Sequence, residues 1–405
     1  MSDYSEALIE NQDSAGTTFT VSFDGVSTST LDQVTPKEVM LGESLLTPGL
    51  QTSVKFDSYI HNNPPKQFDQ FRNAPMFIDI QKPSLGAAGT LQVAQRTYRM
   101  DSRHLINNNN ERFTLRACDD TQLIDPATLV SKSWKCETPS DVVKHVLYVC
   151  LDAKSADIES SSYPRDYIAE NIHPFQVIAQ QTNYALADGD DPSFLHYMTY
   201  ENGGTHKFRS LKYLSYQEPV MQFFYNEIGG SYADPRTIMT YSFPCDFDLM
   251  SDILNGIDAN GNDINSLVLF DPINKSFSMI NSDFGGLGCG IGSGLVKMAI
   301  TNENTYKQQD MCPDYTKQFL QKRQGRMGLL EKDKIALRLT VPFNPVLHAG
   351  KTIYVNLYNK ETPNGAPNYG TGLYLVLHMF HHIIEGGLST TTMDCVASTV
   401  GYKYY

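Results

Sequence analysis

The chain has 405 residues, and at roughly 150 residues per domain this length predicts two or three domains and excludes a single small fold. Hydrophobic residues make up 41% and charged residues 19%, which is too apolar for a disordered chain, and 23 tyrosines with 20 phenylalanines favour a β-rich protein. The formal net charge of −13 argues against a protein that grips nucleic acid, because such binding normally needs a basic face.

The sequence gives little indication of a membrane helix, a signal peptide or a structural role for its cysteines. No apolar run approaches the ~20 residues of a membrane helix, and the first residues lack the basic and apolar regions of a signal peptide. The seven cysteines are widely scattered and none forms a C-x-x-C pair, so neither a zinc ribbon nor a disulfide framework is indicated. We therefore expect reduced thiols and folding in a cytoplasm.

The first quarter of the chain is predicted to consist of strands and turns. A strand is expected over Thr18–Phe23, and further along apolar and polar residues alternate over 54–58 and 76–80. An extended stretch over 90–106 reaches a turn of asparagines, which tolerate positive φ, and the chain returns over 111–118. With no helical stretch among them, these strands indicate a barrel or a sandwich.

A compact α/β unit is predicted over 138–214. Thr138 is a good N-cap with proline at the next position, and apolar residues follow it at helical spacing. A second helix is expected to begin near Pro174. Two strands follow, over 193–200 and 206–214, and the Asn-Gly-Gly between them favours a hairpin.

The remainder of the chain is predicted to return to strands. Strand-like segments lie between turn-rich loops in 218–305, and a helix is expected over 315–330. Two long strands are expected over 373–384 and 390–399, joined by Glu-Gly-Gly. The sequence has no short-period repeat, but at coarse scale it places one β unit near each end with an α/β unit between them.

Two glycine-containing motifs resemble known functional sites, but each lacks a glycine that the site requires. The Ala-Gly-Lys-Thr at 349–352 is the tail of a phosphate-binding loop, but Pro345 stands where that loop needs its first glycine. The glycine-rich 285–294 contains no G-x-G-x-x-G, and Ile291 replaces the glycine that a nucleophile elbow at Ser293 would need. We interpret both as turns or loops.

Two clusters of potential metal ligands also depart from the patterns of known metal sites. The segment 258–263 resembles a calcium loop, but leucine stands at its twelfth position in place of glutamate. On a strand His378 and His382 would share one face and His381 the other, so only two ligands converge and zinc is not indicated. Three aspartates at 188, 190 and 191 are interpreted as a solvated turn, and a basic run over 317–326 is interpreted as a solvated or partner-contacting face. We expect no catalytic, cofactor-binding or metal-binding residues.

Three stretches carry a family resemblance when they are taken in order. The first is FTLRACDDTQLIDPATLVSKSW followed by TPSDVVKHVL, the second is HPFQVIAQQTNYAL followed by SFLHYMTYENGGTHKFRSLKYL, and the third is LRLTVPFNPVLHAGKTIYVNLY followed by GLYLVLHMFHHIIEGGLSTTTMDCVAS. In this order they resemble the central baseplate hub proteins of contractile-tailed phages. The resemblance is weak around 1–45 and 246–305, and it rests on sequential agreement because no single motif is specific.

The resemblance implies an α+β fold that is mainly β. Two tail-tube-like β-barrel domains would flank an α/β domain, with an inserted irregular subdomain. The expected boundaries place the first barrel at 1–135, the α/β domain at 136–217 with the helix at 306–330, the second barrel at 218–245 with 331–405, and the inserted subdomain at 246–305.

The resemblance also implies a structural, non-enzymatic function in the tail baseplate of a virion. Three copies would form a ring that adapts the sixfold tail tube to the threefold spike, and DNA would pass through its lumen without specific binding. The implied partners are the tail spike protein, a tube or tube-initiator protein and the baseplate wedge proteins, with no stable membrane insertion. Spike and cell-wall hydrolase would be separate chains. Because carboxylates repel phosphates, we expect the inner wall to be more acidic than the outer rim.

Other functions stay open at this point. A phage-derived injection particle would need the same hub. A carbohydrate-active enzyme would need a deep pocket with two carboxylates about 5–10 Å apart. A β-rich adhesin would need an exposed aromatic platform, which a single tryptophan does not favour.

Overall fold

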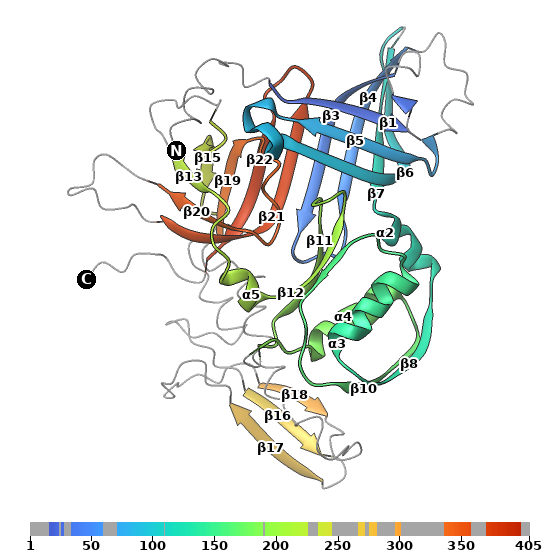
Figure 1. Cartoon of the computed structure of the whole chain (residues 1–405), viewed down its shortest axis with the longest axis vertical. Helices are drawn as coiled ribbons and strands as arrows, with labels where there is room; N and C mark the ends of the chain where they lie inside the picture. Colours follow the sequence, from blue (N-terminus) through green and yellow to red (C-terminus); the bar gives the residue numbers. More distant parts are fainter. Residues whose placement is uncertain are drawn as a thin grey trace, which may run out of the picture.

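The protein is built from two β-barrels and an α/β unit, with a further small sheet (Figure 1). The computed structural model describes residues 16–23, 26–27, 34–59, 71–108, 110–188, 191–225, 234–244, 266–271, 275–281, 296–300, 336–357 and 370–397. Most of these residues lie in antiparallel strands, which confirms the mainly β fold predicted from the sequence. Within this part of the chain, no helix is long and apolar enough to cross a membrane.

The first barrel is an antiparallel sheet in the order β1–β5–β6–β7–β4–β3. Its strands are β1 (Thr18–Phe23), the short β2 (Val26–Ser27) beside β1, β3 (Val34–Ser44), β4 (Gln51–Tyr59), β5 (Pro75–Gln81), β6 (Thr90–Asn107) and β7 (Asn110–Cys118). A 3₁₀ turn, η4 (Pro83–Gly89), connects β5 to β6. The predicted alternation is confirmed on β4, where Val54 and Phe56 are fully buried in the core while Lys55 faces outward.

The second barrel has the order β13–β20–β21–β22–β19–β15, and β14 closes it against β13. Its strands are β13 (Gln222–Tyr225), β14 (Thr237–Ile238), β15 (Thr240–Ser242), β19 (Ala336–Pro342), β20 (Thr352–Asn356), β21 (Gly372–Ile384) and β22 (Thr390–Val396). Buried aliphatic side chains such as Leu339, Val355 and Val376 fill its interior.

The two barrels repeat one topology, although the sequence shows no repeat. If the two-residue β2 is left out and β14 and β15 count as one strand, the neighbours along each sheet are the first, fourth, fifth, sixth, third and second strands in chain order. The fifth strand even shifts register at the same place, between Thr97 and Arg99 in β6 and between Val376 and His378 in β21. The first strand differs in direction, since β1 is antiparallel to β5 and β13 is parallel to β20.

The barrels are joined edge to edge by backbone pairing, which we call the seam. β3 pairs with β4 on one side and with β21 on the other, from Ser44 opposite His378 to Glu38 opposite Ile384. A continuous sheet therefore runs from β19 in the second barrel through β22, β21, β3 and β4 to β7 in the first barrel.

The α/β unit lies beside both barrels (Figure 1). Its elements are α2 (Asp120–Ile124), η5 (Asp125–Ala127), β8 (Val130–Glu137), α3 (Pro139–His145), the π-helical turn η6 (Val146–Cys150), β9 (Ala156–Ile158), β10 (Arg165–Ile172), α4 (Pro174–Tyr184), β11 (Phe194–Thr199), β12 (Thr205–Ser210) and α5 (Leu211–Ser215). Thr138 caps α3 by accepting from the Asp141 amide, as predicted.

Two details of this unit differ from the sequence-based expectation. Val130 and Trp134 on β8 are buried in the α/β core, so this strand lies outside the first barrel, to which the boundary at 135 assigned it. The strand expected over 206–214 ends at Ser210, because that side chain caps a short helix by accepting from the Tyr213 amide.

The inserted segment contributes a three-stranded sheet. Its strands are β16 (Ser266–Asp271), β17 (Ser276–Asn281) and β18 (Val296–Ile300). The central β16 is antiparallel to β17 and parallel to β18. The helix predicted over 315–330, the calcium-like segment 258–263 and the glycine-rich 285–294 lie outside the described residues.

Candidate interaction surface at the seam between the barrels

The outer surface of the continuous sheet is the candidate functional surface, and we call it the seam face. It consists of the outward side chains of β19, β22, β21, β3, β4 and β7, from Arg338 at one end to Arg112 at the other. On β21, His378 and His382 lie on this face, whereas His381 is fully buried. The alternation therefore separates the three histidines as predicted, and the described residues contain no metal-binding cluster.

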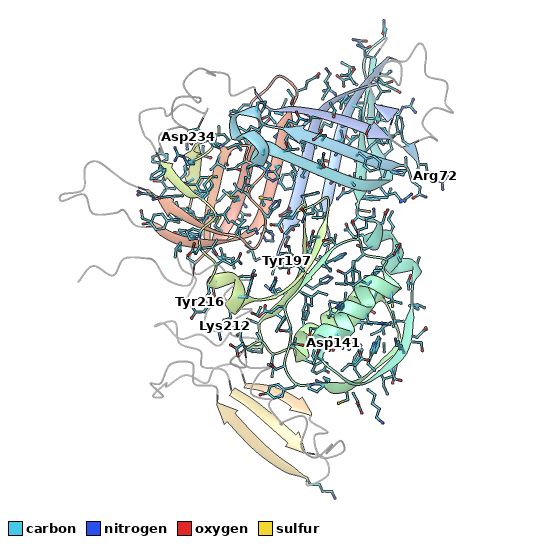
Figure 2. The ribbon with its side chains drawn as sticks, viewed as in Figure 1. Arg72, Asp141, Tyr197, Lys212, Tyr216 and Asp234 are labelled. Atoms are coloured by element: carbon cyan, nitrogen blue, oxygen red, sulfur yellow. The ribbon has the colours of Figure 1, made fainter. Side chains whose placement is uncertain are left out.

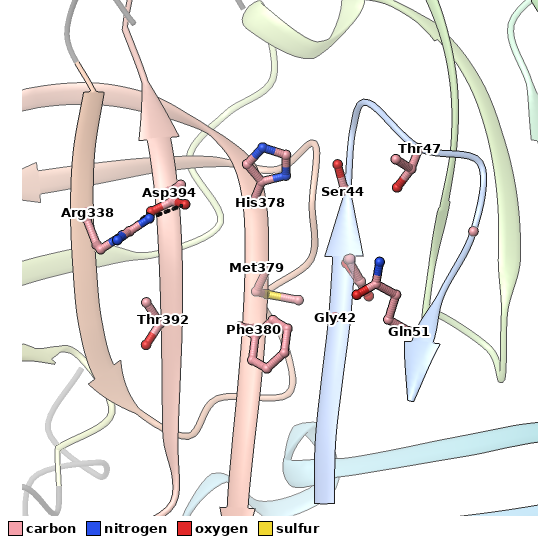
Figure 3. A pocket seen from close by; sticks show the side chains of 12 residues that line it. Gly42, Ser44, Thr47, Gln51, Arg338, His378, Met379, Phe380, Thr392 and Asp394 are labelled. Atoms are coloured by element: carbon pink, nitrogen blue, oxygen red, sulfur yellow. Dashed lines mark hydrogen bonds and ion pairs between the residues drawn. The ribbon is translucent and has the colours of Figure 1, made fainter. Parts of the chain in front are cut away.

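A shallow hollow of about 470 Å³ lies on this face where the barrels meet (Figure 3). Strands of both barrels line it, with Gly42 and Ser44 from β3 and His378 from β21. Arg338 binds Asp394 in a bidentate manner at one edge, with Nε–Oδ1 and Nη2–Oδ2 distances of 2.6 and 2.9 Å. This ion pair raises the pKa of Arg338, so the two charges are held together at any physiological pH.

Ion pairing extends along the rest of the seam face. Glu38 lies 2.5 Å from the Lys55 ammonium and 2.6 Å from His382 Nε2, thereby linking β3 to β4 and to β21. Burial alone would raise the pKa of Glu38, but the hydrogen bonds from Lys55 and His382 lower it. Further along, Asp57 binds the Arg112 guanidinium in a bidentate manner at 2.7 and 2.9 Å. Each of these carboxylates thus has a basic partner, and the face is close to electrically balanced.

Phe380 and Gly42 stand directly opposite each other across the seam. A Cβ on Gly42 would lie 3.1 Å from the Phe380 ring, so the ring covers bare backbone that only glycine provides. The aromatic ring remains 43% exposed on the seam face.

We expect Gly42→Val to lower the free energy of unfolding by about 1–2 kcal/mol, because the added methyl groups displace the Phe380 ring from the strand. Thermal unfolding of the purified variant measures this effect. Ser44→Val on the same face of the same strand is the control, since serine already carries a Cβ there. Equal changes in the two variants would contradict the proposed packing.

A buried carboxylate fixes the junction of the two barrels with the α/β unit. The Glu43 side chain has 0% exposure. Its Oε1 accepts from the Tyr200 amide at 2.6 Å and from His348 Nδ1 at 2.9 Å, and its Oε2 accepts from the Ala349 amide at 2.7 Å. Glu43 belongs to the first barrel, Tyr200 to the hairpin of the α/β unit and Ala349 to the loop before β20. One side chain therefore connects all three units.

Two further contacts close this junction. Tyr197, labelled near the centre of Figure 2, is buried between the α/β unit and the second barrel. Lys82 is 7% exposed and donates from Nζ to the Phe343 carbonyl at 2.6 Å, which ties the first barrel to the second. Burial lowers the pKa of Lys82 to about 8.

Glu43 was not among the residues predicted from the sequence, although its position on β3 carries a signal. Along β3, Val39 and Leu41 face the core, and Glu43 continues this inward series. A carboxylate at an inward position of an alternating strand needs internal donors, so the pattern itself marks a polar junction.

The phosphate-loop-like segment is a turn that leads into β20, as expected. Gly350 has a φ of +84°, and Lys351 Nζ lies 2.8 Å from Glu201. The Ala349 amide, which a phosphate-binding loop would direct to its ligand, donates to Glu43 instead. The interpretation of the aspartates near 188–191 as solvated is wrong for Asp191, which is buried and accepts from the Ser193 hydroxyl. The basic run near 317–326 lies outside the described residues.

Comparison with solved structures finds the same architecture in tail proteins. A tail protein from Neisseria meningitidis MC58 superposes with a TM-score of 0.58 at 10% identity, over 94% of this chain and 96% of that chain. The 43 kDa tail protein of prophage MuSo2 from Shewanella oneidensis gives a TM-score of 0.58 at 6% identity, over 94% and 98% of the two chains.

A third neighbour is the E. coli c3393 protein, a component of the type VI secretion system with structural similarity to the T4 bacteriophage tail proteins gp27 and gp5. It superposes with a TM-score of 0.50 at 10% identity, over 95% of this chain and 79% of that chain. No family model and no curated protein matches the sequence. The chain therefore has the fold of phage tail proteins, and the predicted resemblance to baseplate hub proteins is confirmed at the level of the fold.

Proposed function

We propose that this protein is the structural hub of a contractile-tail baseplate, in which three copies form a ring that joins the sixfold tail tube to the threefold spike. The observation that carries this proposal is the repeated barrel topology. Two barrels of one strand order are joined edge to edge within one chain. Three such chains present six similar barrels to a sixfold partner and keep true threefold symmetry for another partner.

The proposal includes a division of the chain into domains. The first barrel ends near residue 118, and the α/β domain begins near 119 and ends near 217. The second barrel combines 218–245 with 331–405, and 246–305 is an insertion within it. The helix at 306–330 would complete the α/β domain. The hydrophobic clusters support this division, because each barrel and the α/β unit has its own buried core.

We also propose that the seam face lines the lumen through which DNA passes. Its ion-paired carboxylates and guanidinium groups offer no basic stripe to hold the phosphates, which supports transit without specific binding. On this assignment the wall is electrically balanced, in contrast to the inner wall more acidic than the outer rim that we expected from the repulsion between carboxylates and phosphates. Spike, tube and wedge proteins would bind the other surfaces of a virion baseplate, and the function is non-enzymatic.

A second candidate function is the hub of a phage-derived injection particle. The similarity to a type VI secretion component favours it, because that protein shares the fold without belonging to a virion. The two candidates have the same ring and differ in what passes through the lumen.

The mass of the purified chain in solution, combined with particle imaging, tests the proposal. We expect particles of three subunits with an open centre. A monomer that persists at high concentration, with no ring on the grid, would contradict the hub and favour a carbohydrate-active enzyme or an adhesin.

A further inference from the structure

The seam joins strands that hold particular positions in the strand order of the two barrels. In the second barrel, the fourth strand β20 pairs with the fifth strand β21 only over Gly372–Leu375. Beyond the β-bulge, the same edge of β21 continues over 378–384 and pairs with β3, the second strand of the first barrel. The rule is that the later half of a fifth strand pairs with the second strand of the neighbouring barrel.

The fifth strand of the first barrel, β6, matches β21 up to and including this bulge, and it has two further register shifts beyond it, between Asp101 and His104 and between Leu105 and Asn107. Its fourth-strand partner β5 ends opposite Arg96, and the matching bulge follows between Thr97 and Arg99. Beyond the bulge, β7 is the one strand in the described part of the chain that pairs with β6. Large apolar side chains are exposed here, with Tyr98 at 53%, Leu105 at 68% and Ile106 at 45%. Among the described strands, this half of β6 is therefore an edge beside which no second strand lies.

The second barrel offers the complementary edge. Its second strand is β14 with β15, and in the described part of the chain β15 pairs with β19 alone. All three residues of β15 are exposed, whereas Val39 and Leu41 of the equivalent β3 are buried. β15 and β6 lie on opposite sides of the molecule, so they cannot pair within one chain (Figure 1).

We propose that β6 of one copy pairs antiparallel with β15 of a second copy, and so repeats between chains the seam seen within the chain. This inference rests on the proposed ring and specifies its subunit contact. These two edges lie at opposite ends of the part of the chain that the structure describes, so the contact is head to tail and closes when the ring is complete. A second copy is the occupant because it carries β15, which is the equivalent in the second barrel of the β3 that already fills the edge of β21.

The internal repeat also sets the register of this contact. His104 stands opposite Arg112 on β7, as His382 stands opposite Thr390 on the equivalent β22. His382 pairs across the seam with Met40. Met40 stands opposite Ser53 on β4, and the residue equivalent to Ser53 in the second barrel is Arg338 on β19. Ser242 stands opposite Arg338, so Ser242 is the equivalent of Met40. His104 of one copy is therefore expected to lie opposite Ser242 of the next copy.

Cysteine cross-linking tests the contact and its register. The chain with His104→Cys, Ser242→Cys and Cys245→Ser should form disulfide-linked dimers and trimers under mild oxidation, because opposed strand residues reach disulfide geometry. Both substituted positions are exposed, so the fold should tolerate the changes. The matched control pairs His104→Cys with Thr240→Cys in the same background. This pair lies two residues out of register and should cross-link far less.

The outcomes separate the two proposals. A trimeric ring in which the first pair does not cross-link, or in which both pairs cross-link equally, overturns the β6–β15 contact and leaves the hub standing. A chain that stays monomeric overturns the hub and the contact together. Interchain cross-links confined to the first pair support both.

Discussion

Replacing Glu43 by glutamine should lower the free energy of unfolding by about 2–4 kcal/mol, the largest effect expected from a single conservative change in this chain. The carboxylate accepts three hydrogen bonds in a site that excludes water. An amide has only one acceptor oxygen, so its NH₂ group would face either the Ala349 amide or the pair formed by the Tyr200 amide and His348. A buried donor would then be left without an acceptor.

Urea denaturation of the full chain, followed by fluorescence, measures this effect. Glu38→Gln is the matched control, because Glu38 also lies on β3 and also binds basic partners, but its side chain is 17% exposed. We expect the control to cost less than about 1 kcal/mol. Similar midpoints for the two variants would show that Glu43 does not hold the junction. Because Glu43 connects three units, its loss should also separate the transition into steps.

Mild acid should destabilise the protein by at least about 4 kcal/mol between pH 7 and pH 5, because burial lowers the pKa values of three histidines, His196, His206 and His381. Burial lowers the pKa of His206 to about 4 and that of His381 to about 3. His206 lies in a hydrogen-bonded chain, 3.1 Å from His196 on one side and 3.1 Å from the Thr121 hydroxyl on the other. His381 Nδ1 lies 2.8 Å from the Thr391 hydroxyl.

Stability falls with falling pH because each imidazole takes up its proton at a higher pH in the unfolded chain than in the folded chain. The unfolded chain takes up these protons near pH 6.5, whereas the folded chain resists them until about pH 4 or 3. Stability is therefore complete above pH 6.5 and falls as the pH drops below it, by about 1.4 kcal/mol per pH unit for each histidine. Below about pH 5 the carboxylates add their own loss, since hydrogen bonds from Lys207 and Lys351 outweigh burial and lower the pKa of Glu201 to about 2.

Denaturation midpoints at several pH values between 7 and 5 provide the measurement. The double variant His206→Gln with His381→Gln should have a lower midpoint at pH 7 and a flatter dependence on pH. The exposed His104→Gln should keep the slope of the natural chain. A slope that persists in the double variant would assign the acid sensitivity to other groups.

Local physics explains which elements could be predicted from the sequence. Period-two alternation located β4 and β5, because one face of each strand is buried and the other is not. The cap at Thr138 and the proline at 174 located the starts of α3 and α4, since both signals act within one turn.

The seam could not be predicted in the same way. Alternation tells which face of β3 is buried, but it does not tell which strand lies beside β3, and the true neighbour β21 is near the other end of the chain. The repeat of the two barrels was hidden for a related reason. The two barrels share the order of their strands and the place of a bulge, and neither feature requires similar residues.

The pairing of β3 with β21 has a consequence for synthesis on the ribosome. Glu38 and Ile384 stand opposite each other, although nearly the whole chain separates them. At about 5–20 residues per second, translation leaves the edge of β3 uncovered for tens of seconds after the first barrel has emerged. An uncovered edge in a crowded polysome invites pairing between nascent chains. Lys37 and Glu38 at the start of that edge place charge where such premature contact would begin, so this end of β3 can protect the newborn chain until its own C-terminal strand arrives.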